Sequence, residues 1–197
     1  MGNTRNLILI AILAVVGMFG CSTYNGMATT EQGVKKAWGE VENQFQRRSD
    51  LIGNLVSTVK GAADFEQGTL TAVVEARAKA TAMRVDPNDL TPENIEKYQA
   101  AQGSLGSAMS RLMMVTENYP QLRATEQFKG LSDELAGTEN RIATARRDFN
   151  TAVGDYNGRI VRFPANIFAG MFGYKEKGFF KADEGASKAP TVDFGKK

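Results

Sequence analysis

The sequence predicts an all-α protein: an antiparallel up-and-down four-helix bundle with long first and fourth helices, preceded by an N-terminal hydrophobic anchor or signal helix. Three observations lead to this prediction. Large apolar residues recur at steps of three and four, which places them on one stripe of a helix. Turn residues around Pro87 and Pro120 separate these stripes. An apolar run of 14 residues, 7–20, lies near the N-terminus.

Composition and charge exclude several classes of function. A chain of 197 residues is long enough for one domain with its own core. Its 24 basic and 22 acidic residues are interleaved, so we expect no nucleic-acid partner. The chain has no histidine and a single cysteine, Cys21. Because histidine is the commonest general base and metal ligand, we expect no enzyme, no metal and no cofactor.

Residues 1–21 are expected to be a signal peptide or a membrane anchor. The apolar run has the length of a secretory signal core and is shorter than the roughly 20 residues that span a bilayer. It ends in Gly20-Cys21, which resembles a lipoprotein signal, so Cys21 is a candidate for lipidation. The alternative is an uncleaved anchor, extended by residues 22–24 to about 18 residues. In both cases Arg5 favours a cytoplasmic N-terminus and a domain on the outer side.

The bundle domain is expected to span residues 24–163. Its first helix has the apolar stripe Met27, Val34, Trp38, Val41, Phe45, Ile52, Leu55 and Val59. Gly53, inside this helix, predicts a kink. The helix ends either at residues 61–64, where Asp64 and Gln67 have the spacing of a capping box, or at residues 49–53. We prefer the first, because it gives helices of about 57, 30, 40 and 60 Å that close an up-and-down bundle.

The remaining helices follow from caps and breakers. The second is expected to end near Arg84, before the turn residues 86–89. The third begins with Thr91 as N-cap and Pro92 in the first position, and ends before Pro120. The fourth is expected to span residues 120–163. Its stripe consists of Phe128, Leu131, Leu135, Thr138, Ile142, Ala145, Phe149, Ala152, Tyr156, Ile160 and Phe163.

Residues 164–182 form an aromatic C-terminal segment. On the up-and-down topology this segment returns to the anchored end of the first helix, where four of its residues are expected to contact the membrane or a partner. These four are Ile167, Phe168, Met171 and Phe172. The alternative is that they fold back and close the end of the bundle. Residues 183–197 are small and polar, and we expect a disordered tail.

A polar network is expected between the first and fourth helices. Its members are Arg47, Arg48 and Asp50 of the first and Glu139, Arg146 and Asn150 of the fourth. One hypothesis is a binding site between helices. The other, which we favour, is a set of ion pairs that fixes helix register. The sequence contains no glycine-rich phosphate loop, nucleophile elbow or metal-ligand spacing.

Several motifs resemble the bacterial LemA family. They are QRRSDLIGNLV at residues 46–56, ENYP at 117–120, TENRIA at 138–143 and FP at 163–164. The resemblance covers residues 24–180. It departs from the family pattern at Gly53, where the family usually has proline, and at Asp64, where it has histidine. It implies a membrane-tethered antiparallel helical bundle and carries no agreed activity.

These observations lead to two hypotheses of function. The first is a membrane-anchored bundle on the periplasmic side of a bacterial membrane, acting as a non-catalytic scaffold for other, unknown envelope proteins. The second is a ligand-binding or sensor module, in which the Arg/Asp/Glu network binds a small anion or a peptide.

Overall fold

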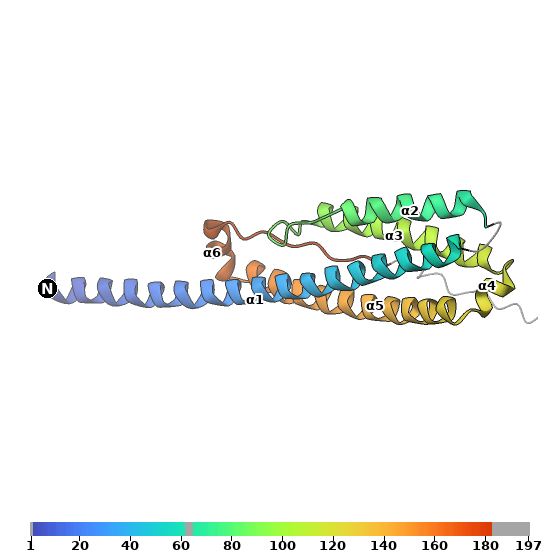
Figure 1. The fold of residues 1–197 in the computed structure, drawn as a ribbon. Helices are drawn as coiled ribbons and strands as arrows, with labels where there is room; N and C mark the ends of the chain where they lie inside the picture. The colour runs from blue at the N-terminus through green and yellow to red at the C-terminus, as the bar shows by residue number, and fades with distance from the viewer. Residues whose placement is uncertain (1, 62–64, 183–197) are drawn as a thin grey trace, which may run out of the picture.

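The computed structural model describes residues 2–61 and 65–182, in which every regular element is a helix (Figure 1). The helices are α1 (Gly2–Lys60), α2 (Gln67–Ala82), α3 (Pro92–Thr116), α4 (Pro120–Ala124), α5 (Glu126–Val161) and α6 (Ala165–Phe172). The predicted all-α class is therefore confirmed. The disordered tail at 183–197 and the Asp64 cap lie outside the described residues.

The helices form two layers (Figure 1). α1 runs the whole length of the molecule, and α5 returns beside it from the end at which α4 lies. α2 and α3 pair with each other in the second layer, and α2 contacts α1. The N-terminal part of α1 projects beyond all the other helices. The finer assignment, an antiparallel four-helix bundle, stays a prediction.

The end of α1 decides between the two positions predicted for the first turn. It continues through residues 49–53 and ends at Lys60, so a turn at 49–53 is wrong. Gly53 instead leaves room for another helix: a Cβ there would lie 3.3 Å from the Arg77 guanidinium carbon. Arg77 Nε donates to the Ser49 carbonyl oxygen at 2.7 Å, which joins α2 to α1. The kink at Gly53 stays a prediction.

The predicted fourth helix is broken near its start, which corrects the expected single helix over 120–163. Thr125 adopts an extended backbone between α4 and α5. Its hydroxyl accepts from the Phe128 N–H at 3.3 Å and donates to the Leu122 carbonyl oxygen at 2.7 Å, so it caps α5 and closes α4. α5 then ends at Val161, and Phe163, expected in the buried stripe, is 81% exposed.

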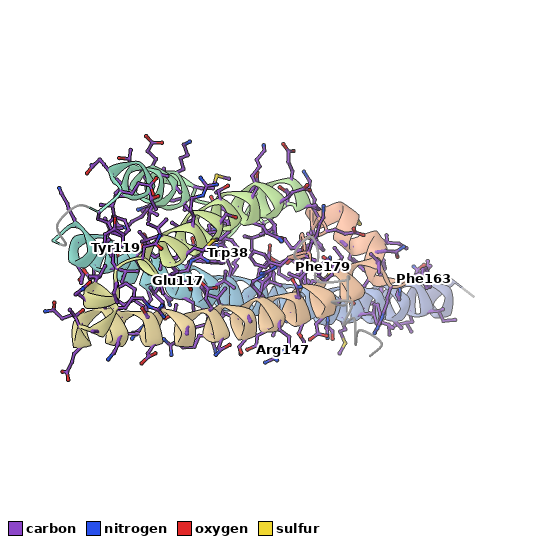
Figure 2. All side chains as sticks on the ribbon, turned by 90° about the vertical axis from the view of Figure 1, so that its right-hand side faces the viewer. Trp38, Glu117, Tyr119, Arg147, Phe163 and Phe179 are labelled. Carbon is purple, nitrogen blue, oxygen red and sulfur yellow. The ribbon has the colours of Figure 1, made fainter. Side chains whose placement is uncertain are left out.

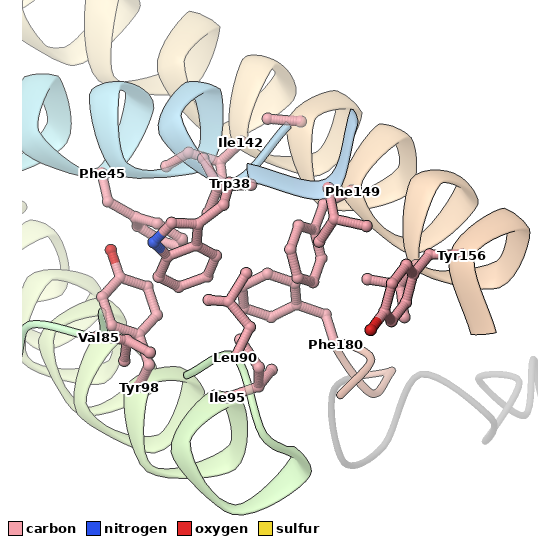
Figure 3. Close-up of a cluster of buried hydrophobic side chains, with 14 of the residues drawn as sticks. Trp38, Phe45, Val85, Leu90, Ile95, Tyr98, Ile142, Phe149, Tyr156 and Phe180 are labelled. Atoms are coloured by element: carbon pink, nitrogen blue, oxygen red, sulfur yellow. The ribbon is translucent and has the colours of Figure 1, made fainter. Parts of the chain in front are cut away.

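The core consists of two hydrophobic clusters. The Trp38 cluster lies between residues 27–45 of α1 and 142–160 of α5. Here the Trp38 ring makes edge contacts with the rings of Tyr98 and Phe149, with distances between ring centres of 4.9 and 5.5 Å (Figure 3). The Leu55 cluster lies between residues 51–59 of α1, α2, α3 and the start of α5. Each fully buried large side chain contributes about 1.5–3 kcal/mol relative to exposure.

After α6 the chain runs back along the molecule as a C-terminal strap, residues 174–182. Side-chain amides of α5 and α3 hold its backbone with paired hydrogen bonds. The Asn157 amide binds both the backbone N–H and the carbonyl oxygen of Lys177, each at 2.9 Å. The Asn150 amide binds the same two backbone groups of Phe180 at 2.9 Å. The Gln99 amide binds those of Lys181 at 3.0 Å. The Phe180 ring is buried and stacks on Trp38 at 6.1 Å.

The strap also closes over the start of α3. Gly178 N–H donates to the Leu90 carbonyl oxygen at 2.9 Å. A Cβ on Gly178 would lie 2.6 Å from Pro92 Cα, closer than any real contact. The buried ammonium of Lys177 lies 3.2 Å from Glu31 Oε1 and donates to the Asn88 carbonyl oxygen at 3.2 Å. These contacts join α1, the α2–α3 turn and the strap.

We expect Gly178→Ala to destabilise the chain, because the new methyl group meets backbone atoms of Pro92. Overpacking of this kind costs about 1–3 kcal/mol, which lowers the melting temperature by roughly 2–4 °C per kcal/mol in a chain of this size. The matched control is Gly154→Ala in α5, where a Cβ meets nothing within 4 Å and alanine favours the helix. Thermal unfolding followed by circular dichroism measures both; equal shifts would contradict the close approach.

Candidate functional site

Arg48 is the centre of a buried polar layer between the two clusters. It occupies the gap in the α1 stripe, and its side chain is 7% exposed. Nη2 donates to the carbonyl oxygen and the Oε1 atom of Gln102, at 3.0 and 2.7 Å, and Nη1 lies 3.2 Å from Glu139 Oε1. Ser49, Gln102 and Thr138 are also buried at this level. A buried charge is tolerated only when it is paired and hydrogen-bonded, as Arg48 is.

Tyr98 connects this layer to the Trp38 cluster. Burial raises the pKa of its hydroxyl, the Glu42 carboxylate raises it further, and a hydrogen bond with Gln102 offsets part of the shift. The hydroxyl therefore stays protonated at physiological pH. Burial likewise raises the pKa of the Glu42 carboxyl group. Both shifts follow mainly from desolvation at the edge of the core.

The other two members of the network on α1 face different partners. Arg47 pairs with Glu134, one turn before Glu139 on α5. Asp50 lies 3.7 Å from Arg77 of α2 and accepts from Gln46 at 3.0 Å. Successive helical residues project about 100° apart, so residues 47, 48 and 50 cannot all face α5.

Arg146 and Asn150 of α5 bind the strap. Arg146 donates to the Lys181 carbonyl oxygen at 2.7 Å, and its guanidinium lies 5.3 Å from the centre of the Phe180 ring. Asn150 is the amide that pairs with the Phe180 backbone. The structure therefore joins Arg48 to Glu139, and it places Arg146 and Asn150 at a second location. Of the six residues predicted as one network, only Arg48 and Glu139 pair with each other. Arg47 and Asp50 pair with residues outside the set, and Arg146 and Asn150 bind the strap.

An open groove lies beside the polar layer, between α3 and α5 and above α1. Its volume is about 960 Å³. Apolar side chains from all three helices line it, together with charged groups of both signs. The apolar lining includes Ile52, Met109, Met113, Met114, Phe128 and Leu135; the charged lining comprises Arg48, Glu117, Arg123, Lys129, Asp133 and Glu139. Glu117 and Tyr119 mark this end of the molecule in Figure 2, opposite to Phe163.

Two buried polar atoms at this groove have no hydrogen-bond partner among the described residues. They are Arg48 Nε and Ser132 Oγ, and both residues line the groove. Buried donors are normally satisfied, so their presence at one groove is consistent with a polar ligand group. Sequence reasoning missed the groove. Its one visible signal is the methionine group at 109, 113 and 114, since methionine is common on adaptable binding surfaces.

The N-terminal part of α1 has the length and composition of a membrane-spanning helix. It contains an 18-residue window that passes this test, none of it buried against the rest of the chain. Cys21 directly follows the apolar run of residues 7–20 and is unpaired and exposed. These features agree with a signal or an anchor.

α6 lies directly beside the end of the apolar run. Phe168 approaches Phe19, with ring centres 6.4 Å apart, and Phe172 meets Tyr24 at 5.0 Å. Phe168 is half-buried and packs against the Trp38 cluster. Ile167, Met171 and Phe172 are exposed. The four residues singled out from the sequence therefore divide: one packs inward, and three face outward.

The described residues define an all-helical protein whose first helix carries a segment of membrane-spanning character and whose distal half holds an open groove. Among these residues, no group of three or more His, Cys, Asp or Glu side chains is placed to hold a metal ion. The chain belongs to the LemA family, whose model matches residues 37–194, so the resemblance seen in the motifs is confirmed.

Several relatives extend this assignment. The chain is 28% identical to the magnetosome proteins MamQ 1 and MamQ 2 of Paramagnetospirillum magneticum, over 97% of this chain and 77% of each relative. It is 25% identical to MamQ of Magnetospirillum gryphiswaldense with the same coverage. It is 22% identical to protein LemA of Metamycoplasma hominis, over 81% of this chain and 69% of the relative.

We expect Glu139→Gln to destabilise the chain by about 1–3 kcal/mol, because it removes the charge that faces the buried Arg48 guanidinium. The matched control is Glu134→Gln, which changes the partner of Arg47. The Arg47 side chain is 52% exposed, whereas that of Arg48 is 7% exposed, so losing the partner of Arg47 leaves a solvated charge and we expect about 0–1 kcal/mol. Urea denaturation in detergent measures both. Equal costs would show that the Arg48 layer contributes no more than a surface ion pair.

Proposed function

We propose that this LemA-family protein is a membrane-anchored, non-catalytic scaffold of the bacterial cell envelope that binds a partner protein in the groove between α3 and α5. The groove carries the proposal. Its apolar lining and mixed-charge edges have the composition of a protein-binding surface. In this proposal the groove binds its partner without a chemical reaction. Burial of its apolar area supplies affinity, and its charged groups select the partner.

Membrane anchoring rests on the exposed apolar segment of α1. Either this segment stays in the bilayer, or the chain is cleaved before Cys21 and held by acyl chains on that residue. Exposure of Cys21 is compatible with both routes. Arg5 supports a cytoplasmic N-terminus, which puts the helical domain on the periplasmic side. The mass of the native protein distinguishes the two routes.

The fold that presents the groove is, in this proposal, an antiparallel up-and-down four-helix bundle of α1, α2, α3 and α5. The paths of the helices in Figure 1 support it, as do the pairings of α1 with α5 and of α2 with α3. The short helices α4 and α6 then close its two ends. An antiparallel bundle with short turns leaves its outer grooves free for partners.

We expect Met114→Glu to abolish partner binding without unfolding the chain, because Met114 lines the groove and is 65% exposed. The measurement is cross-linking and co-purification from native membranes, followed by binding of the purified partner. The control is Val74→Glu on α2, where an exposed apolar residue lies away from the groove. Equal recovery of the partner with both variants would contradict the assignment of the groove.

The second candidate function is a ligand sensor at the Arg48 layer. The observation that favours it is the unpartnered Arg48 Nε atom beside the groove. A ligand at 100 times its dissociation constant stabilises its protein by about 2.7 kcal/mol. A thermal shift with a panel of small anions and peptides tests this candidate. A shift that is lost in Arg48→Met supports the sensor. No shift with any of them, together with partner binding, supports the scaffold.

A further inference from the structure

The uninterrupted apolar run of α1, residues 7–20, is shorter than a typical membrane span, so a span of α1 has to include the less apolar residues that follow it. A hydrocarbon layer of about 30 Å needs roughly 20 helical residues. Starting from Leu7, such a span ends near Gly26, but the run ends at Gly20. The residues between are Cys21, Ser22, Thr23, Tyr24, Asn25 and Gly26. This part of α1 is polar where a full span would still be apolar.

α6 packs against α1 at this polar interval. Phe168 comes within 3.2 Å of the position of a Cβ on Gly20, and Phe172 makes an edge contact with Tyr24. Gly173 ends α6 in a left-handed conformation, with φ of 75°, and the Tyr174 N–H then bonds to the Ala169 carbonyl oxygen at 3.0 Å. The contacts therefore place α6 beside the first residues that follow the apolar run.

The outward side of α6 is apolar. Ile167 and Met171 are four residues apart in α6, so they share one side of this helix, and Phe163 lies in the turn just before it. They are 81%, 55% and 73% exposed, and Phe172 beside them is 53% exposed. Figure 2 shows Phe163 at the end of the helical domain from which α1 emerges. In a protein surrounded by water, exposed apolar residues gathered in this way mark a contact surface.

Basic side chains lie next to this surface. Arg162 precedes Phe163, and Lys175 follows α6; both are exposed. Arg159, in the last turn of α5, lies so close to α1 that a Cβ on Gly26 would be 3.2 Å from its guanidinium carbon. Aromatic and aliphatic residues flanked by cations are typical of segments at the boundary between headgroups and acyl chains.

We propose that α6 is an interfacial helix: its outward side, formed by Phe163, Ile167, Met171 and Phe172, inserts into the headgroup–acyl boundary of a bilayer beside the polar interval of α1. The occupant of this surface is a lipid leaflet. The inference deepens the proposed membrane anchoring and rests on it. It holds for either route, because lipidated Cys21 would place its acyl chains beside the same helix.

Phe168 packs against the protein, whereas Ile167, Met171 and Phe172 face the lipid in this arrangement. Its half-buried ring fixes α6 to α1 and to the Trp38 cluster. The exposed residues contribute little to folding, since they gain few contacts within the chain. Changes at Met171 therefore alter the lipid contact and leave the fold unchanged.

The test uses the full chain in vesicles of phosphatidylcholine and phosphatidylglycerol. Cys21→Ser gives a cysteine-free background, because Cys21 is the only cysteine. Met171→Cys then carries a nitroxide label, and Met114→Cys is the control, a methionine of similar exposure at the far end of the domain. Leu13→Cys reports the bilayer interior. Collision rates with oxygen, which concentrates in lipid, and with a water-soluble nickel complex are compared.

We expect the ratio of oxygen to nickel collisions at position 171 to lie between the values at 13 and 114, and several-fold above the value at 114. A ratio at 171 equal to that at 114 overturns the inference. A spectrum at 171 broadened by spin–spin coupling that grows with protein density overturns it as well, because the surface then contacts a second copy of the chain.

Flotation of the same vesicles separates the two proposals. If the chain floats with the lipid and position 171 is in water, the membrane anchoring stands and the inference about α6 fails. If the chain does not float, anchoring by the uncleaved apolar segment fails, and the inference fails with it. If the chain floats and position 171 is in the boundary region, both are supported.

Discussion

The structure depends on the burial of one shared stripe between α1 and α5. These two helices are the longest in the described residues, and each is apolar along the side that faces the other. Isolated helices gain little stability from propensity alone, so this contact is what makes both of them persist. The pair forms the long axis of the molecule, and the remaining elements cover the apolar surface that the pair leaves exposed. α2 and α3 lie on one side, the strap lies between α3 and α5, and α6 lies at one end.

A charged residue, Arg48, interrupts this contact between α1 and α5, and it organises the half of the molecule that holds the groove. Arg48 has a position in the stripe that an apolar residue would fill, and its charge is balanced by Glu139 and Gln102. The layer divides the core into two clusters. A change of register between α1 and α5 would remove Arg48 from these partners and leave a charge buried without compensation. The polar layer therefore selects one alignment of two helices whose apolar stripes alone would tolerate several.

Sequence reasoning predicted what is local and missed what joins distant segments. Stripes, caps and turns are local, so the helical class, the cap at Thr91 and the turn after Asp86 are all found where the pattern places them. Thr125 was missed because Pro120 already serves as a helix start in the sequence, although threonine three residues before Phe128 has the spacing of an N-cap. The strap depends on amides of Asn150, Asn157 and Gln99 that meet backbone atoms far along the chain. Of the predicted polar network only the Arg48–Glu139 pair forms, since periodicity gives the helix face but not the partner opposite each residue.

The continuity of α1 has a mechanical consequence. From Gly20 to Arg48 the chain is a single helix, which spans about 42 Å at 1.5 Å per residue. In the proposed anchoring, such a helix is a spacer of fixed length between the lipid and the groove. Any protein that occupies the groove must present its own binding surface at that height above the bilayer. Because α1 also lines the groove, a change in the tilt of α1 would reorient a protein bound there.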